Sequence, residues 1–395
     1  MSDVLIPAND AEAAAVIAEA RKARRPLSIC GGNSRSGLGR FAQTEATLST
    51  ADLLGITLHE PAELVIAARA GTPLAEVERK LGEDGQELAF EPMDHRRLFG
   101  SRGEPTIGAV AACNISGPRR IAAGAARDAL IGVRLVNGRG EVVKSGGRVV
   151  KNVTGLDLAR LVCGAYGTLG LLTEVTFRVR PKAERSSTLV FEGLDDARAV
   201  AALSKGLGSP FEVSGAAHLT AGMGGDAPRT LLRIEGFSNS VEHRLGELTR
   251  LLVDCRAPRV LDGEASLFLW RDVRDAAFLA EPRERAVWRI SVAPSNGPKF
   301  VASLDVAGAR HFYDWGGGLV WLSCEAAGDA GAGAVRAAVA KLGGHATLVR
   351  APAEVRAVVP VFEPLSAPAL KITAGLKASF DPDAILNPGR MYAGV

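Results

Sequence analysis

The chain has 395 residues, of which 47% are hydrophobic and 23% charged, a composition typical of a globular protein with two or three domains. Its 45 glycines exceed the usual share of about 7%, which indicates backbone that turns tightly or lies against a ligand. The formal net charge is +3 and the basic residues are scattered, so the composition gives no support to nucleic-acid binding.

Short strands and helices alternate in the first part of the chain. In order, we expect a helix over 11–24, strands over 27–30 and 64–69, a helix over 73–81, strands over 129–136 and 141–144, and a strand that ends at Pro181. Asn9 or Asp10 can cap the first helix, and Asn137-Gly138 is a hairpin signal between the two paired strands. We place a domain boundary after Pro181, which gives a first domain over 1–182.

The middle of the chain predicts one order of elements, β-α-β-β-α-β, twice. The first set covers 188–191, 195–204, 211–219, 230–235, 240–253 and 258–261. After a linking helix over 266–275, the second set covers 288–292, 299–306, 310–313, 319–324, 334–342 and 346–350. Two such units indicate a second domain, over 183–355, with an antiparallel sheet covered by helices on one face. The tail, 356–395, is rich in turn residues and is expected to pack back on the first domain.

The cysteines and the apolar segments restrict the class of protein further. The five cysteines lie far apart without a C-x-x-C pair, which argues against a zinc ribbon, an iron–sulfur cluster or a disulfide scaffold. Arg24-Arg25 is followed by Pro26 and not by the apolar run of a signal peptide, and no segment is uncharged and apolar enough to span a bilayer. We therefore expect a soluble cytoplasmic protein.

Three side-chain-poor stretches carry the candidate chemistry. The first is ICGGNSRSGLGR, residues 29–40, in which a strand breaks into a loop whose backbone N–H groups can form a nest for a pyrophosphate. An ordinary turn is the alternative, and the loop matches neither a Walker motif nor a G-x-G-x-x-G fingerprint. The second, residues 100–132, can lie against a flat ring system or form a tightly packed buried turn and helix. The third, residues 145–181, contains Gly-Thr-Leu-Gly before a strand, and a salt bridge is expected between its Lys151 and Asp157.

The order and spacing of these stretches resemble the FAD-binding domain of the vanillyl-alcohol-oxidase/p-cresol-methylhydroxylase (PCMH) superfamily. Within it, the chain resembles the FAD-binding E subunits of bacterial glycolate oxidases over nearly its whole length. The matching segments are Ser116-Gly117-Pro118-Arg119-Arg120, Gly146–Asn152, Trp288-Arg289-Ile290-Ser291, Asp314-Trp315-Gly316-Gly317 with Trp321, Phe380-Asp381-Pro382 and Asn387–Met391. Ala109 and Leu156 depart from the usual Gly and Tyr. The resemblance implies an α+β fold, with a two-lobed PCMH-type FAD-binding domain and a cap domain of ferredoxin-like βαββαβ units.

The resemblance also implies which residues hold FAD. The pyrophosphate would lie on the loop of Gly31, Gly32, Asn33, Ser34, Arg35 and Ser36. The flavin and adenosine parts would contact Thr106, Ile107, Gly108, Asn114, Ser116, Gly117, Gly167, Thr168, Gly170 and Asn387. Relatives with covalent flavin often place a histidine where this chain has Asn33, so non-covalent FAD is expected.

Oxidation of a 2-hydroxy acid needs a cation for the carboxylate and a base for the hydroxyl proton. Arg289 is the candidate for the carboxylate, because a guanidinium matches it bidentately; a salt bridge on the sheet is the alternative role. His311 is the candidate base, although a histidine at a strand start is more often structural.

The sequence also leads us to expect partners. The related catalytic flavin subunit carries an H-x-G-D-G-N-x-H type stretch that can bind a metal, but no two of the six histidines here lie within four residues of each other, so no metal site is expected. The family implies a glycolate (or D-lactate) dehydrogenase complex with a catalytic flavin subunit and an iron–sulfur subunit, linked to the membrane only through quinone-reducing partners. The alternatives are a catalytically silent FAD-binding subunit and a stand-alone flavoenzyme with another substrate.

Overall fold

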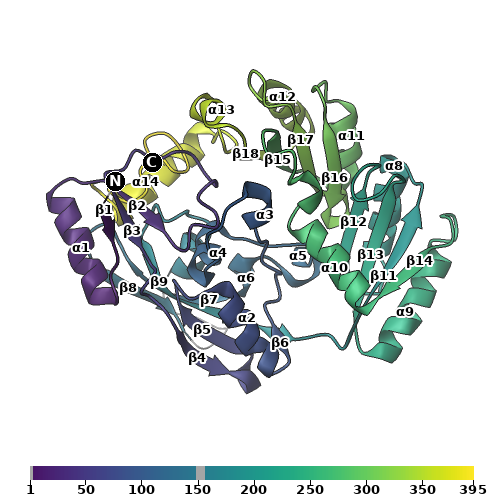
Figure 1. Ribbon diagram of the computed structural model, residues 1–395, viewed down its shortest axis with the longest axis horizontal. Coiled ribbons are helices and arrows are strands. Elements are labelled where there is room, and N and C mark those ends of the chain that lie inside the picture. Colours follow the sequence, from purple (N-terminus) through teal and green to yellow (C-terminus); the bar gives the residue numbers. More distant parts are fainter. Residues whose placement is uncertain (1–2, 148–155) are drawn as a thin grey trace.

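Two sheets of different kinds form the N-terminal domain of the computed structural model, which describes residues 3–147 and 156–395 (Figure 1). The strands of the first are β1 Asp3–Leu5, β2 Leu27–Cys30 and β3 Ala46–Ser49; those of the second are β4 Ile56–Glu60, β5 Val65–Arg69, β7 Leu130–Val136, β8 Val142–Gly146 and β9 Leu171–Arg178. The first sheet is parallel in the order β1-β3-β2, and the second is antiparallel in the order β4-β5-β9-β7-β8. A short antiparallel pair, β6 Gln86–Glu87 with β10 Arg180–Pro181, completes the N-terminal domain. Strand β10 comes just before the chain enters the cap domain.

Short helices fill the space around these sheets. They are α1 Asp10–Lys22, α2 Leu74–Glu83, α3 Arg96–Phe99, α4 Ile107–Cys113, α5 Arg120–Ala123, α6 Ala126–Ala129 and α7 Leu158–Val162, with the 3₁₀ turn η1 Pro61–Glu63. The predicted first helix is confirmed as α1, and Asn9 caps it by accepting a hydrogen bond from the N–H of Glu12 (3.0 Å). Its buried residues Ala13, Ile17 and Ala20 follow the helical spacing expected of a packed face.

One eight-stranded antiparallel sheet forms the cap domain. Its strands are β11 Arg185–Glu192, β12 Val213–Leu219, β13 Arg229–Gly236, β14 Arg259–Asp262, β15 Ala286–Ser291, β16 Arg310–Asp314, β17 Leu319–Cys324 and β18 His345–Arg350, in the order β14-β11-β13-β12-β16-β17-β15-β18. Each half is one βαββαβ unit, and the second strands of the two units pair through His218 with Tyr313 and Leu219 with Phe312. The predicted duplication is therefore confirmed.

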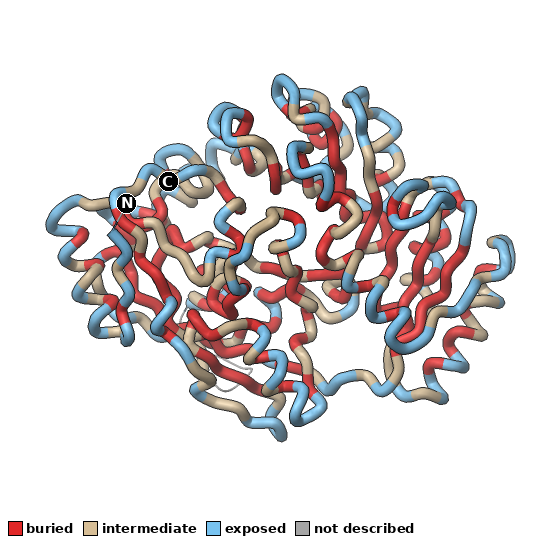
Figure 2. The backbone as a smooth tube through the Cα atoms, in the orientation of Figure 1, coloured by how far each residue is buried: buried red, intermediate tan, exposed pale blue. Residues whose placement is uncertain are grey.

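Helices cover one face of this sheet and the N-terminal domain lies against the other. The cap helices are α8 Asp196–Leu207, α9 Ser238–Leu251, α10 Gly263–Arg274, α11 Gly297–Ala302 and α12 Ala332–Leu342, with the 3₁₀ turns η2 Ala277–Leu279, η3 Pro294–Asn296 and η4 Trp315–Gly317. Side chains of α8, α9 and α12 share clusters with one face of the strands, whereas the other face shares a cluster with the N-terminal domain. Figure 2 shows the strands of the sheet as largely buried and the outer turns of the helices as exposed.

The tail differs from the turns that the sequence predicts. It contains α13 Ala353–Val358 and the 14-residue helix α14 Ala367–Phe380, of which only Lys377 is buried. Beyond α14 the chain runs beside β2, where the N–H of Leu27 donates to Ile385 O (2.7 Å) and the N–H of Asn387 donates to Leu27 O (2.9 Å). Among the described residues, no helix combines the length and the apolar character needed to cross a membrane. The domain limits of 1–182, 183–355 and 356–395 stay a prediction.

One predicted helix is shorter in the structure, and one predicted ion pair involves a residue outside the described ranges. The helix expected over 299–306 is shorter, α11, and ends at Ala302. Arg148–Asn152 of the third stretch lies outside the described residues, so the expected Lys151–Asp157 pair is not described; Asp157 instead caps α7 by accepting from the N–H of Arg160 (3.1 Å).

Candidate functional site

A deep cavity opens in the N-terminal domain between β2, α4 and the C-terminal segment. Its empty space is about 880 Å³, the open mouth included, which is within the range of cofactor pockets. The whole predicted loop 31–36 lines it, together with Gly108, Gly167, Gly170 and Asn387. The structure thus brings parts of all three side-chain-poor stretches to one cavity. The remaining lining residues, which the sequence did not single out as binding residues, are Ser28, Ile29, Cys30, Leu38, Thr50, Ala70, Ala109, Ala112, Cys113, Tyr166, Leu171, Leu172 and Arg390.

The glycine loop needs its glycines because another backbone segment lies against it. A Cβ on Gly32 would lie 2.1 Å from the carbonyl oxygen of Glu104, and one on Gly31 would lie 2.4 Å from Thr106 Oγ1. Asn33 takes a left-handed conformation (φ 60°) at this point, a region that asparagine tolerates. The loop is therefore fixed in shape by its contact with the segment that precedes α4.

Asn387 connects three parts of the cavity wall. Its Oδ1 accepts from the N–H of Ile29 (2.9 Å), and its Nδ2 donates to Tyr166 O (2.7 Å). Arg390, three residues later, donates from Nη2 to Ser36 O (3.0 Å). The C-terminal segment therefore completes the cavity that the glycine loop begins.

Two predicted residues, Ile107 and Thr168, are not among the residues that line the cavity. Ile107 is in the core, and its N–H donates to Thr72 O; the N–H of Gly108, which does line the cavity, donates to Ala70 O, so neither amide is free for a ligand. Thr168 donates from its hydroxyl to Ala165 O (2.7 Å). These residues shape the wall.

Three other predicted residues hold turns further from the cavity. Asn114 Oδ1 accepts from the N–H of Arg127 (3.0 Å), and Ser116 Oγ accepts from the N–H of Ala126 (2.9 Å) at the start of α6. The carbonyl of Gly117 accepts from Trp315 Nε1 of the cap domain (3.1 Å). Gly117 therefore contributes to the contact between the domains, and the flavin contacts expected of these three residues stay a prediction.

Arg289 lies on the sheet face that meets the N-terminal domain. Its cross-strand partner is Trp321, which in turn pairs with Phe312, and residues opposite each other in a sheet share a face. The Arg289 guanidinium lies 4.9 Å from the centre of the Trp315 ring and forms no ion pair with any described residue. Burial, together with the like charge of Arg120, lowers the pKa of Arg289 to about 10. The salt bridge that was the alternative role for Arg289 is not seen among these residues.

His311 lies on the opposite face, which argues against the role of base. It pairs with Leu322, which belongs to the helix-covered cluster, and its Nε2 is 2.9 Å from Asp196 Oδ2 at the start of α8. Tyr313 donates to the same carboxylate oxygen (2.7 Å). His311 is therefore a partner of Asp196 beneath the helices and does not share a site with Arg289.

Asp314 is the acid that lies near Arg289. It is 2% exposed, and its side chain lies on the same face of β16 as Phe312, two residues earlier. Its Oδ1 accepts from the N–H of Trp315 (2.7 Å). Burial raises the pKa of Asp314 to about 7 against the opposing effect of that hydrogen bond. Trp315 itself has φ 52°, a conformation that is costly for a bulky residue and that often marks a functional site.

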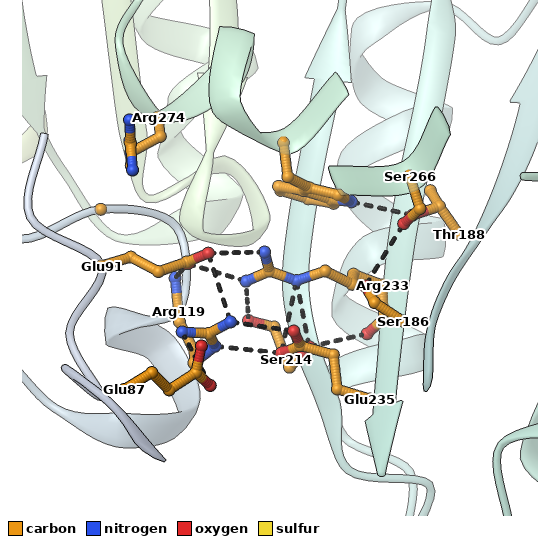
Figure 3. Close-up of polar contacts among 12 residues, drawn as sticks. Glu87, Glu91, Arg119, Ser186, Thr188, Ser214, Arg233, Glu235, Ser266 and Arg274 are labelled. Atoms are coloured by element: carbon orange, nitrogen blue, oxygen red, sulfur yellow. Dashed lines mark hydrogen bonds and ion pairs between the residues drawn. The ribbon is translucent and has the colours of Figure 1, made fainter. Parts of the chain in front are cut away.

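A buried network of charges joins the two domains beside this site (Figure 3). Arg233 of β13 donates from both terminal nitrogens to Glu91 (2.8 Å each), and Arg119 donates to Glu235 (3.0 and 2.9 Å). Arg119 also lies 3.4 Å from Glu91 and 3.5 Å from Glu87. Because both pairs cross between the domains, the network fixes the cap domain relative to the cavity.

Comparison with known proteins identifies the family. A family model described as "FAD binding domain" matches residues 2–146. Glycolate oxidase subunit GlcE of Escherichia coli is 35% identical over 372 residues, which cover 94% of this chain and 93% of that protein. The chain belongs to the GlcE family of glycolate oxidase subunits. Glycolate oxidase subunit GlcD of Bacillus subtilis is 27% identical over 323 residues (73% and 68%). The fold resembles 4-ethylphenol oxidase from Gulosibacter chungangensis, with a TM-score of 0.73 and 13% identity over 99% of this chain and 89% of that one.

The GlcE-family chain is therefore a flavoprotein oxidoreductase with FAD as its cofactor. The cavity fits that group, because two buried polar atoms at the glycine loop, Thr106 Oγ1 and Arg35 Nε, have no hydrogen-bond partner among the described residues. Arg35 and Arg390 add two positive charges to a wall that is otherwise poor in side chains, which suits a pyrophosphate. Leu156, the departure noted in the third stretch, is 80% exposed.

Proposed function

We propose that this chain is the FAD-binding subunit of a heteromeric dehydrogenase that oxidises glycolate, or a closely similar 2-hydroxy acid such as D-lactate. FAD, when bound, supplies an acceptor for hydride or electrons and can pass electrons on singly to an iron–sulfur partner. The observation that carries the proposal is the guanidinium of Arg289, which faces the N-terminal domain and forms no direct ion pair with any described residue.

Arg289 binds the carboxylate of the substrate in this proposal. A guanidinium that is partly buried without an acid is costly to the fold unless a ligand supplies the negative charge. The charges of Tyr166, which lines the cavity, and of Asp314 raise the pKa of Arg289 against the effect of burial, which supports a place for the arginine near the cavity.

Asp314 takes the role of base that the sequence suggested for His311. A carboxyl group with a pKa of about 7 is partly ionised at neutral pH and can accept a proton there. Its hydrogen bond from the N–H of Trp315 fixes its orientation (2.7 Å). The support is its burial on the face of Arg289, which His311 does not share.

The partners follow from the family and from the cysteines. The names of the related proteins, glycolate oxidase subunits GlcE and GlcD, support a complex of several subunits. The five cysteines are scattered along the sequence, so we assign the iron–sulfur centre to a separate subunit, and contact with the membrane to quinone-linked partners.

Anaerobic mixing with glycolate tests the proposal. The purified chain, loaded with FAD, should lose its flavin absorbance when glycolate is added, either alone or together with its co-purifying partners. Arg289→Gln should raise the glycolate concentration at which half of the flavin absorbance is lost about 10- to 100-fold, because it removes charge-assisted hydrogen bonds to the substrate. Arg271→Gln is the matched control, since Arg271 also stacks on an aromatic ring, Phe268, but is exposed on α10.

Two outcomes would favour the alternatives. Flavin absorbance that persists with the chain alone but is lost in the complex, with no effect of Arg289→Gln, would make this chain a silent FAD-binding subunit. Reduction by NADPH and not by glycolate would make it a stand-alone flavoenzyme with another substrate.

A further inference from the structure

A second arginine lies on the same tryptophan as Arg289. The guanidinium of Arg120, at the start of α5 in the N-terminal domain, lies 4.7 Å from the centre of the Trp315 ring, and that of Arg289 lies 4.9 Å from it. The two guanidinium carbons can be no further apart than the sum of these distances. One cation comes from each domain, and the indole of Trp315 holds both.

Neither cation is neutralised by the protein. Arg120 and Arg289 form no ion pair and no side-chain hydrogen bond with any residue that the structure describes. The charge of Asp128 raises the pKa of Arg120 against the larger effect of burial, but its carboxylate accepts a hydrogen bond from the N–H of Ala125 (2.8 Å) and none from Arg120. The neighbouring buried arginines Arg119 and Arg233, by contrast, each form ion pairs with carboxylates.

Stacking alone does not account for this arrangement. A cation–π contact adds only a modest stabilisation, whereas two like charges at one ring repel each other and burial lowers the pKa of both arginines. Trp315 is moreover held at φ 52° by the hydrogen bond to Asp314, and its Nε1 is fixed on Gly117 O. The protein thus fixes the ring that carries both cations.

We propose that Arg120 and Arg289 together form a carboxylate site with Trp315 as its floor, and that Arg120 is a second substrate-binding residue supplied by the N-terminal domain. Two guanidinium groups favour an anion that offers acceptor oxygens on two separate carboxyl carbons, so a dicarboxylate binds this site more tightly than a monocarboxylate. The inference rests on the proposed function for the identity of the ligand, a 2-hydroxy acid, but the anion site itself does not depend on turnover.

Binding of oxalate, a dicarboxylate without a hydroxyl group to oxidise, tests the site directly. The FAD-loaded chain is titrated with oxalate and with acetate by calorimetry, and the flavin absorbance is recorded in parallel. The wild type should bind oxalate more tightly than acetate. Arg120→Gln should weaken oxalate binding about 10- to 100-fold and acetate binding less, so that the preference between the two anions falls. Arg271→Gln should change neither.

A second uncharged variant guards against loss of folding. Arg120→Met keeps a long apolar stem on the indole without the charge, and it should show the same loss of preference as Arg120→Gln; thermal unfolding confirms that each variant is folded. The inference is overturned if a folded Arg120→Gln or Arg120→Met protein keeps the oxalate affinity and preference of the wild type. Oxalate binding that depends on Arg120 would support the anion site. If glycolate does not bleach the flavin of the same protein, that result would contradict the oxidation proposed above.

Discussion

Glu91 and Arg233 join the two domains through a buried bidentate pair, with both N···O distances at 2.8 Å. Glu91 comes from the segment before α3, and Arg233 is on β13 of the cap domain. The carboxylate of Glu91 also accepts from the N–H of Arg119 (2.8 Å). Since Arg119 precedes Arg120 in the chain, the same pair orients the segment that carries the proposed anion site.

Removing the charge of Glu91 should destabilise the protein strongly. Glu91→Gln removes the bidentate acid of the buried Arg233 and leaves it only Glu235 at 3.6 Å, and breaking a buried pair costs about 3–5 kcal/mol in the free energy of unfolding. Glu83→Gln is the control, because Glu83 pairs with Arg79 on the exposed surface of α2, where solvent screens the pair and its loss should change stability little. Urea unfolding of both variants measures the difference; equal stabilities would contradict the structural role of the network.

Acid should weaken the same network. Burial would raise the pKa of Glu91, but the guanidinium groups of Arg233 and Arg119 outweigh it and lower the pKa to about 2. A carboxylate whose pKa is lower in the folded state stabilises the fold above its unfolded pKa, near 4.5, and loses that contribution as the pH falls toward 2. The free energy of unfolding, measured from pH 6 to 2.5, should fall more steeply for the wild type than for Glu91→Gln. Parallel slopes would argue against this assignment.

The glycine loop gives a steric prediction. Gly32→Ala places a Cβ against the carbonyl oxygen of Glu104, so the loop must shift and FAD affinity should fall about tenfold or more. Gly82→Ala in α2 meets no atom within 4 Å and should raise stability by about 0.5–1 kcal/mol without a change in FAD binding. Fluorescence titration with FAD and thermal unfolding compare the two, and unchanged FAD affinity in Gly32→Ala would show that the loop does not hold the cofactor.

Asp314 predicts a pH dependence of flavin reduction. Burial raises its pKa to about 7, so the group is protonated and cannot accept a proton below that pH, and is ionised above it. The rate of anaerobic reduction by glycolate should therefore rise with pH up to about 7 and level off above. Asp314→Asn should lower the rate by about 10²- to 10⁴-fold, whereas Asp226→Asn, in an exposed loop, should leave it unchanged. A profile that is flat from pH 5.5 to 8.5 would exclude Asp314 as the base.

The sequence predicts most of the fold because local signals agree with the tertiary structure. Asn9 caps α1, Asn137-Gly138 joins β7 to β8, and alternating strands and helices give the duplicated cap sheet. Helix α14 was missed because its exposed positions include Leu370 and Ile372, so it lacks the apolar periodicity that identifies a helix. Its one buried residue, Lys377, donates from Nζ to Thr168 O (2.8 Å), a contact between distant parts of the chain that no local pattern reveals.

The candidate site was predictable only in part. The glycine loop and Arg289 are visible in the sequence through composition and motif. His311 and Asp314 are an odd number of positions apart in one strand, so the sequence predicts that their side chains lie on opposite faces of the sheet. Which of these faces meets the other domain depends on the packing of the whole sheet. Arg120 lies in the matching Ser116–Arg120 segment, but no role of its own could be assigned to it from the sequence, because its position on Trp315 brings together residues almost two hundred positions apart.

The cavity of the N-terminal domain should take up FAD reversibly, and titration of the folded apoprotein with FAD tests this most directly. We expect saturable uptake with one FAD per chain, and release of all the flavin into the supernatant when the loaded protein is precipitated with acid. A folded preparation that takes up no FAD in excess, even with its partners present, would contradict the assignment of the cavity; flavin that stays on the unfolded chain would contradict non-covalent binding.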